Sequence, residues 1–134
     1  MSDNLKIWNA VKQVPPSFLK PIGFGKLKGK SDINPQWRIM AMTQAFGVVG
    51  HGWTYRIVRT WNESAPDGSV MCFAEVAVKT KIDGEWGQEF GGIGGSNSIE
   101  KNKNGLVAND DGYKMAVTDA LSVAFKAVGI AADI

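Results

Sequence analysis

The 134-residue sequence has little of what metal centres and nucleophilic active sites need, since it contains one cysteine and one histidine. Cys72 has no partner for an internal disulfide, and a single thiol is typical of a reducing compartment. A zinc cluster or a Cys–His pair would need ligands that the chain lacks, and its acidic residues show no catalytic pairing. We therefore expect no metal, no cofactor and no enzymatic reaction.

The sequence also lacks long apolar runs and a strong net charge. No segment approaches the roughly 18 apolar residues of a membrane span, and the first residues, MSDNLK, lack the apolar centre of a signal peptide. We therefore expect a cytoplasmic protein with no membrane partner. The formal net charge is only +2, which is too small in itself to indicate nucleic-acid binding, so the distribution of the charges carries more information.

Composition and helix signals indicate one ordinary globular domain, residues 1–134. Hydrophobic residues make up 44% of the chain and charged residues 21%, as in most soluble domains. Short helices are predicted over residues 3–13 and 34–46. The second has Asn34 at its N-cap and Pro35 at its first position, both typical of a helix start.

From residue 52 to residue 93 the apolar pattern changes to the period of two that indicates strands. Strands are predicted over 53–61, 70–82 and 86–93, with the Asp83–Gly84 dipeptide as a hairpin turn. The glycines of the third strand, QEFGGIGG, indicate close approach by the following helix or by a ligand. We expect an α+β fold: a curved antiparallel three-stranded β-meander, followed by a long C-terminal helix packed on it and preceded by N-terminal helices.

The C-terminal helix, predicted over residues 110–129, divides into an apolar arc and a polar stripe. Lys114, Thr118, Ser122 and Lys126 recur along the stripe at intervals of four. A merely solvated helix face usually alternates Glu and Lys. Hydroxyl groups bounded by two ammonium groups favour contact with a row of phosphates instead.

Further basic residues lie in a connector and on the predicted meander. The connector, residues 17–33, is predicted to be mobile, and its four lysines between positions 20 and 30 have no acid among them. A plain solvated loop explains this composition equally well. The candidate contacts with a DNA backbone are Lys20, Lys26, Lys28, Lys30, Arg56, Arg59, Lys79, Lys101, Lys103, Lys114, Thr118, Ser122 and Lys126.

Other interpretations compete with phosphate binding. Gly29–Lys30–Ser31 matches the end of a P-loop, but the pattern needs a glycine where this chain has Phe24, so a nucleotide-hydrolysing recombinase with a degenerate P-loop is an alternative. A regulator that binds another protein through an exposed β-edge is a second alternative. Most aromatic residues are expected in the core rather than stacked on bases. Trp53, Tyr55 and Trp61 are expected on the inner face of their strand.

Three segments resemble the single-strand annealing proteins of phage recombination. More distantly, they resemble the annealing domain of the ring-forming eukaryotic double-strand-break repair protein. The first is residues 34–53, where a helix ending in FG is followed by a glycine turn and a tryptophan-led strand. The second is the glycine-rich strand 88–95, and the third is the helix 113–131, built around AVTDA. With PPSFLK at 15–20, the resemblance spans nearly the whole chain from residue 15.

This resemblance implies a protomer with a β-β-β-α core that associates into a homo-oligomeric ring or helical filament. Single-stranded DNA would lie in a continuous basic groove, and annealing in recombination and repair would proceed without ATP. The resemblance places backbone contacts at Lys20, Lys114, Thr118 and Lys126, whereas Ser122 and Val123 stand where the eukaryotic relative has two basic residues. A phage protein of this kind would act in the cytoplasm of the host bacterium. The sequence leaves open whether an exonuclease or a single-strand-binding protein is a further partner.

Overall fold

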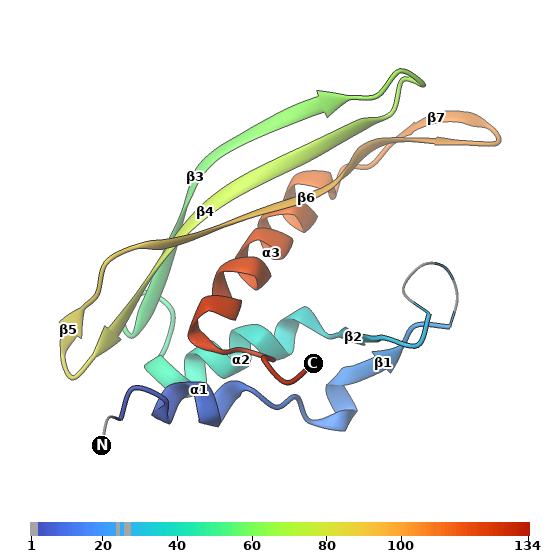
Figure 1. Cartoon of the computed structure of the whole chain (residues 1–134). Helices are drawn as coiled ribbons and strands as arrows, with labels where there is room; N and C mark the ends of the chain where they lie inside the picture. Colours follow the sequence, from blue (N-terminus) through green and yellow to red (C-terminus); the bar gives the residue numbers. More distant parts are fainter. Residues whose placement is uncertain (1–2, 24, 26–27) are drawn as a thin grey trace. The chain divides into compact units, whose positions relative to one another are not determined.

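The computed structural model describes residues 3–23, 25 and 28–134, which belong to two compact units (Figure 1). Unit 1 comprises Met1–Trp53 and Phe125–Ile134, and unit 2 comprises Thr54–Ala124. The single domain expected from the chain length stays a prediction. Each unit is described by itself below.

Unit 1 contains the predicted N-terminal helices. The first is shorter than expected, whereas the second matches the prediction because its signals are strong. The Asn34 side chain accepts a hydrogen bond from the Gln36 backbone N–H at 2.9 Å, and Gly47 follows the last turn. The elements of unit 1 are α1 (Lys6–Val11), η1 (Pro16–Phe18), β1 (Leu19–Pro21), β2 (Ser31–Ile33), α2 (Pro35–Phe46) and, near the C-terminus, η2 (Lys126–Val128).

The described part of the connector, residues 17–33, contains a β-hairpin that the sequence did not predict, whereas its mobility stays a prediction. β1 pairs with β2 in antiparallel register, with Lys20 opposite Asp32. Ile22 N–H donates to the Lys30 carbonyl at 2.9 Å, and Gly29 N–H donates to the Ile22 carbonyl at 3.1 Å. The sequence did not indicate these strands, because segments of three residues, LKP and SDI, are too short to show an alternation of apolar and polar residues.

The core of unit 1 is built around Trp53 and Phe125, which meet edge to face with ring centres 5.5 Å apart. The C-terminal residues lie against the end of α1. Ala131 N–H donates to the Val11 carbonyl, and Asp133 N–H donates to the Lys12 carbonyl. Residues far apart in sequence thus build one hydrophobic centre: Val11, Val14, Ile33, Trp37, Ala41, Met42, Trp53, Phe125, Ile130 and Ala131.

Unit 2 is a curled antiparallel sheet with a helix packed on it, which confirms the α+β class and the C-terminal helix. The sheet has five strands in the order β3-β4-β6-β7, with β5 paired to β4, so the three-stranded prediction is wrong. The elements are β3 (Trp53–Ser64), β4 (Val70–Ile82), β5 (Glu85–Trp86), β6 (Phe90–Asn102), β7 (Gly105–Ala108) and α3 (Gly112–Phe125). The two additional strands, β5 and β7, are too short to show an apolar period. The end of β6 is polar and shows none either.

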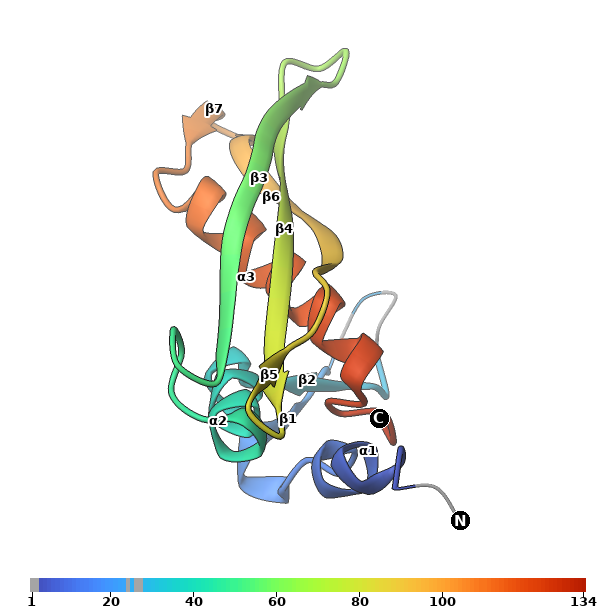
Figure 2. The same cartoon turned by 90° about the vertical axis from the view of Figure 1, so that its left-hand side faces the viewer.

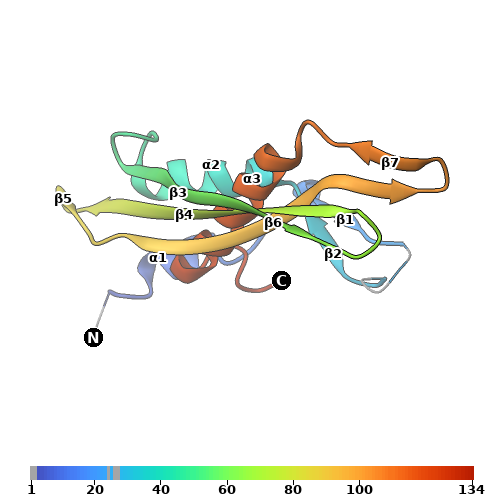
Figure 3. The same cartoon turned by 90° about the horizontal axis from the view of Figure 1, so that it is seen from above.

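α3 runs along one face of the sheet (Figure 2 and Figure 3). On β4 this face carries Cys72, Ala74, Val76 and Val78, all fully buried, as the alternation of the strand predicted. A Cβ atom placed on Gly92 or Gly94 of β6 would overlap the backbone of α3 at Ala120. The glycines of this strand therefore admit the following helix, which was one of the two expected explanations.

Candidate nucleic-acid interface

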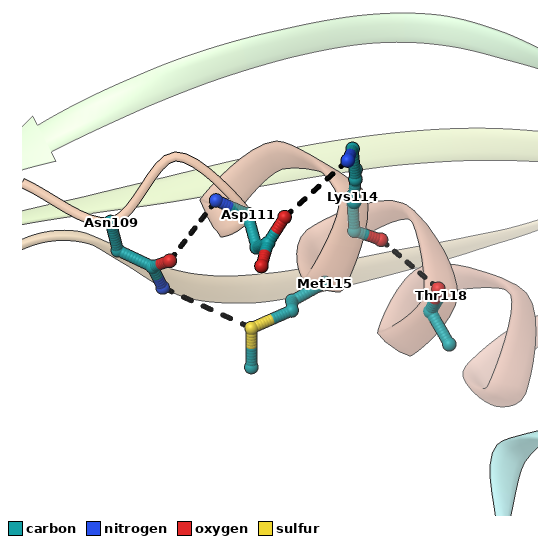
Figure 4. Close-up of polar contacts among 5 residues, drawn as sticks. All are labelled: Asn109, Asp111, Lys114, Met115 and Thr118. Carbon is teal, nitrogen blue, oxygen red and sulfur yellow. Dashed lines mark hydrogen bonds and ion pairs between the residues drawn. The ribbon is translucent and has the colours of Figure 1, made fainter.

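The polar stripe of α3 lies on the part of the helix that is not buried against the sheet. The Lys114 side chain is 82% exposed, and its Nζ lies 3.4 Å from Asp111 Oδ1. The Thr118 hydroxyl donates to the Lys114 carbonyl at 3.0 Å (Figure 4). The Ser122 hydroxyl donates to the Thr118 carbonyl at 3.1 Å. Both hydroxyl protons are used inside the helix, so each group must rotate before it can donate to a phosphate.

The helix is shorter than predicted at both ends. Asn109 Oδ1 accepts the Asp111 N–H at 3.0 Å, which makes a turn that precedes α3 (Figure 4). At the other end, Lys126 begins a tighter 3-10 turn, which closes at Gly129 with φ of +102°. Lys126 therefore belongs to unit 1 and does not continue the α-helical stripe of unit 2.

The two predicted arginines of β3 both form ion pairs within the sheet. Arg56 donates to both carboxylate oxygens of Glu89, at 2.7 Å and 3.2 Å. Arg59 donates to Glu75 at 2.8 Å. The hydrogen bond from Arg56 lowers the pKa of Glu89, and the same bond raises the pKa of Arg56. The carboxylates therefore balance much of the charge of these guanidinium groups. The sequence did not predict the two ion pairs, because they depend on the register of the strands.

Beside these pairs, Trp61 stacks on Phe73 with ring centres 5.5 Å apart and an interplanar angle of 20°. The Arg59 guanidinium lies 4.5 Å from the centre of the Trp61 ring. Of the aromatic residues expected on the inner face of β3, Trp53 is buried, but Tyr55 is exposed and Trp61 is only half-buried. Phe73 and Glu75 lie on the face of β4 opposite the buried Cys72 and Ala74, so the inner-face prediction is wrong for Trp61. Of the three residues, Trp53 alone is in the core.

Lys79 lies beside an aromatic residue that the sequence reasoning did not select. Lys79 Nζ is 5.6 Å from the centre of the Trp86 ring, and Lys81 Nζ is 5.8 Å from it. Lys81 is directly opposite Trp86 in the β4–β5 ladder, and Trp86 is 41% exposed. The Asp83–Gly84 hairpin signal could have found this cluster, because a two-residue turn fixes the register of the residues beside it.

The β6–β7 end of the sheet carries Lys101 and Lys103, both exposed. Lys101 lies near the end of β6. It lines a shallow polar hollow together with Asp67, Ser69, Asn97 and Glu100. A hydrogen bond from the Ser69 hydroxyl lowers the pKa of Asp67, and Lys101 adds to this shift. Lys101 thus has acidic neighbours, and Lys103 lies in the turn before β7.

In unit 1, Lys20, Lys28 and Lys30 are exposed on the β1–β2 hairpin, whereas Lys26 lies outside the described residues. None of the three forms an ion pair within the described part of the chain. The backbone here differs from a P-loop. The Gly29 N–H is bonded to Ile22, and Ser31 begins a strand rather than a helix.

Among the residues that the structure describes, no group of three or more His, Cys, Asp and Glu side chains could hold a metal ion. Cys72 is buried, and its thiol donates to the Ser96 carbonyl at 3.5 Å. The described helices include none that is long and apolar enough to cross a membrane.

Comparison with protein-family models gives no matching family, and a search of curated proteins gives no match either.

Proposed function

We propose that this protein binds the backbone of single-stranded DNA and anneals complementary strands without ATP, as a homo-oligomeric ring or filament acting in recombination and repair. The main observation in support of the proposal is how α3 packs on the sheet. Ala120 and Ala124 are buried where Gly92 and Gly94 admit the helix backbone. Lys114, on the opposite side of the helix, is thereby held on the outside of a rigid element, with the half-buried Thr118 and Ser122 following it along the stripe.

Binding through phosphates gives affinity that does not depend on base sequence, because it rests on the release of counterions. The bases remain free to test a complementary strand. Lys114 of α3 and the exposed lysines of the β1–β2 hairpin, Lys20, Lys28 and Lys30, supply the positive charge in this proposal. Lys126, Lys101 and Lys103 are exposed and remain candidates. Arg56 and Arg59 are weaker candidates because of their carboxylate partners.

A protomer with a few phosphate contacts binds weakly, so assembly supplies avidity along the strand. The edge strand β3 supports assembly. Among the described strands it pairs with β4 alone, and it exposes Ile57 at 51% and Val58 at 40%. An exposed apolar edge strand is a ready surface for another chain, and here we propose a second copy. If a different protein occupied this edge instead, the chain would act as a regulator with no affinity for single-stranded DNA.

The nucleotide-hydrolysing alternative is not favoured, because the Gly29 N–H that a phosphate would need is used inside the hairpin. The test is annealing of two complementary oligonucleotides by the purified protein without nucleotide. We expect annealing to proceed. A strict ATP requirement, together with loss of activity in a folded Lys30→Ala variant, would favour the recombinase alternative.

The role of α3 is tested by titrating labelled oligo-dT at several salt concentrations. Lys114→Gln removes one phosphate contact, so the slope of log affinity against log salt should fall by about 0.7. Lys6→Gln, on the exposed side of α1, is the matched control and should leave the slope unchanged. A folded protein that does not bind oligo-dT at low salt would overturn the proposal.

Assembly is tested by sedimentation. Ile57→Lys adds a charge to the exposed edge of β3, so we expect smaller species than for the unmodified protein. Leu5→Lys, at an equally exposed position before α1, should leave the size unchanged. If Ile57→Lys assembles like the unmodified protein, β3 is not the contact between copies.

A further inference from the structure

The two faces of the β4–β5 hairpin carry side chains of different charge. Residues that oppose each other in an antiparallel ladder share a face. Lys81 pairs with Trp86, whereas Ile82 pairs with Glu85. Lys79, two residues before Lys81, lies on the same face as Lys81. One face therefore carries two ammonium groups and an indole, and the other carries the carboxylate.

The positive charge of this face belongs to lysines with no ion-pair partner among the described residues, although Asp83 and Glu85 lie in or beside the turn of the same hairpin. Arg56 is balanced by Glu89 and Arg59 by Glu75. Lys79 contributes to the lowered pKa of Glu89, but in the described part of the chain neither Lys79 nor Lys81 forms an ion pair. Once the two arginine pairs are set aside, the unbalanced cations are the two lysines beside Trp86.

The indole of Trp86 remains accessible to a flat ligand. The residue is 41% exposed, and the two ammonium groups lie over the ring, 5.6 Å and 5.8 Å from its centre. These distances are at the outer limit of a cation–π contact, so neither lysine is packed tightly onto the ring.

We propose that Trp86, Lys79 and Lys81 form a binding unit for one unpaired nucleotide, with the base stacked on the indole and its phosphate between the two lysines. The inference rests on the proposed function and adds to it a contact with a base as well as with the backbone. Stacking on an aromatic ring tolerates any base because every base has a π-face. An acidic peptide would use the lysines but would leave the indole face unoccupied.

The test compares oligo-dT with an abasic oligonucleotide of equal length, which has the same phosphates and no bases, by fluorescence anisotropy. Trp86→Leu keeps apolar bulk but removes the aromatic face, and the exposure of the residue favours retention of the fold. Stacking contributes about 1–3 kcal/mol per base, so Trp86→Leu should weaken oligo-dT binding by roughly 5-fold or more. Its affinity for the abasic strand should not change. Ile82→Ala, on the opposite face of the same hairpin, is the matched control.

The outcomes separate the two proposals. If the unmodified protein binds neither oligonucleotide, the proposed function fails. If it binds both equally well and Trp86→Leu has no effect, the stacking inference is overturned while phosphate binding stands. If Trp86→Leu weakens both by the same factor, the residue has a structural role only and the inference is likewise overturned. If Trp86→Leu loses affinity for oligo-dT but not for the abasic strand, the result supports the inference.

Discussion

On the side of β4 that faces α3, Cys72, Ala74, Val76 and Val78 are fully buried, whereas on the other side Glu75, Lys79 and Lys81 keep partial exposure. The buried side is stabilised by close packing, which includes direct contact between the backbones of β6 and α3. The other side is held by ion pairs and by contacts between cations and aromatic rings. Substitutions on the first side should therefore act on stability, and those on the second side should act on binding.

The largest effect is expected where β6 and α3 meet. Gly94→Ala places a Cβ against the backbone of α3 at Ala120, where no flexible side chain can move aside. We expect the free energy of unfolding to fall by about 3 kcal/mol, measured by urea denaturation. Gly87→Ala, whose added Cβ would lie 3.6 Å from its nearest neighbour, is the control. Equal stability of the two variants would refute direct backbone packing.

A smaller loss is expected when a polar link between the helix and the sheet is removed. Asp119 Oδ2 accepts a hydrogen bond from the Gly95 N–H at 3.0 Å. Asp119→Ala leaves this N–H without its partner, and the unfolding free energy should fall by about 1 kcal/mol. Asp110→Ala, in the turn before α3, serves as the comparison. If Asp110→Ala lowers the unfolding free energy as much as Asp119→Ala does, the hydrogen bond from Gly95 of β6 makes no specific contribution to stability.

On the binding side, balanced and unbalanced cations should behave differently. Lys79→Gln combined with Lys81→Gln removes surplus charge, so the salt dependence of oligo-dT binding should flatten by up to about 1.4 in slope. Arg56→Gln combined with Glu89→Gln removes a pair whose charges already cancel, and the slope should change by much less. Equal changes in the two double variants would show that ion pairing does not weaken Arg56 as a phosphate contact.

The smallest effect concerns pH. The pKa of Glu89 is lowered in the folded state by the hydrogen bond from Arg56, so the unfolded chain binds a proton more readily. The stabilisation from this pair is present above the ordinary glutamate pKa and is lost as the pH falls through the lowered value. Unfolding followed between about pH 6 and pH 3 should depend slightly less on pH in Glu89→Gln. A steeper dependence in this variant would contradict the assignment.

The parts of the fold that could be predicted are those with a long period or a strong local signal. The thirteen residues of β4 alternate cleanly, and Asn34 and Pro35 mark the start of α2. Asp83 and Gly84 both adopt positive φ, 52° and 82°, as the two-residue turn predicted. In contrast, β1, β2, β5 and β7 have at most four residues each, which is too few to establish a period.

For the candidate interface, the sequence identified basic residues but not their partners. The ion pairs of Arg56 and Arg59 join residues 33 and 16 positions apart, so they depend on how the strands align. Trp86 was missed for the same reason, because only the hairpin register brings it opposite Lys81. Residue type predicts which side chains carry charge, whereas tertiary structure decides how much of that charge is left for a ligand.

The close contact of the α3 backbone with Gly92 and Gly94 of β6 has a consequence for the geometry of a bound strand. These two glycines have no side chain that can repack, so the helix is held in place there, and successive turns of its polar stripe keep the helical rise of about 6 Å per four residues. Phosphates that met Lys114 and then Thr118 would be about 6 Å apart along the helix. Neighbouring phosphates of one strand are separated by more than the axial rise of about 3.4 Å per nucleotide, so a DNA chain could follow this spacing without being stretched, and the helix would set the distance between its backbone contacts.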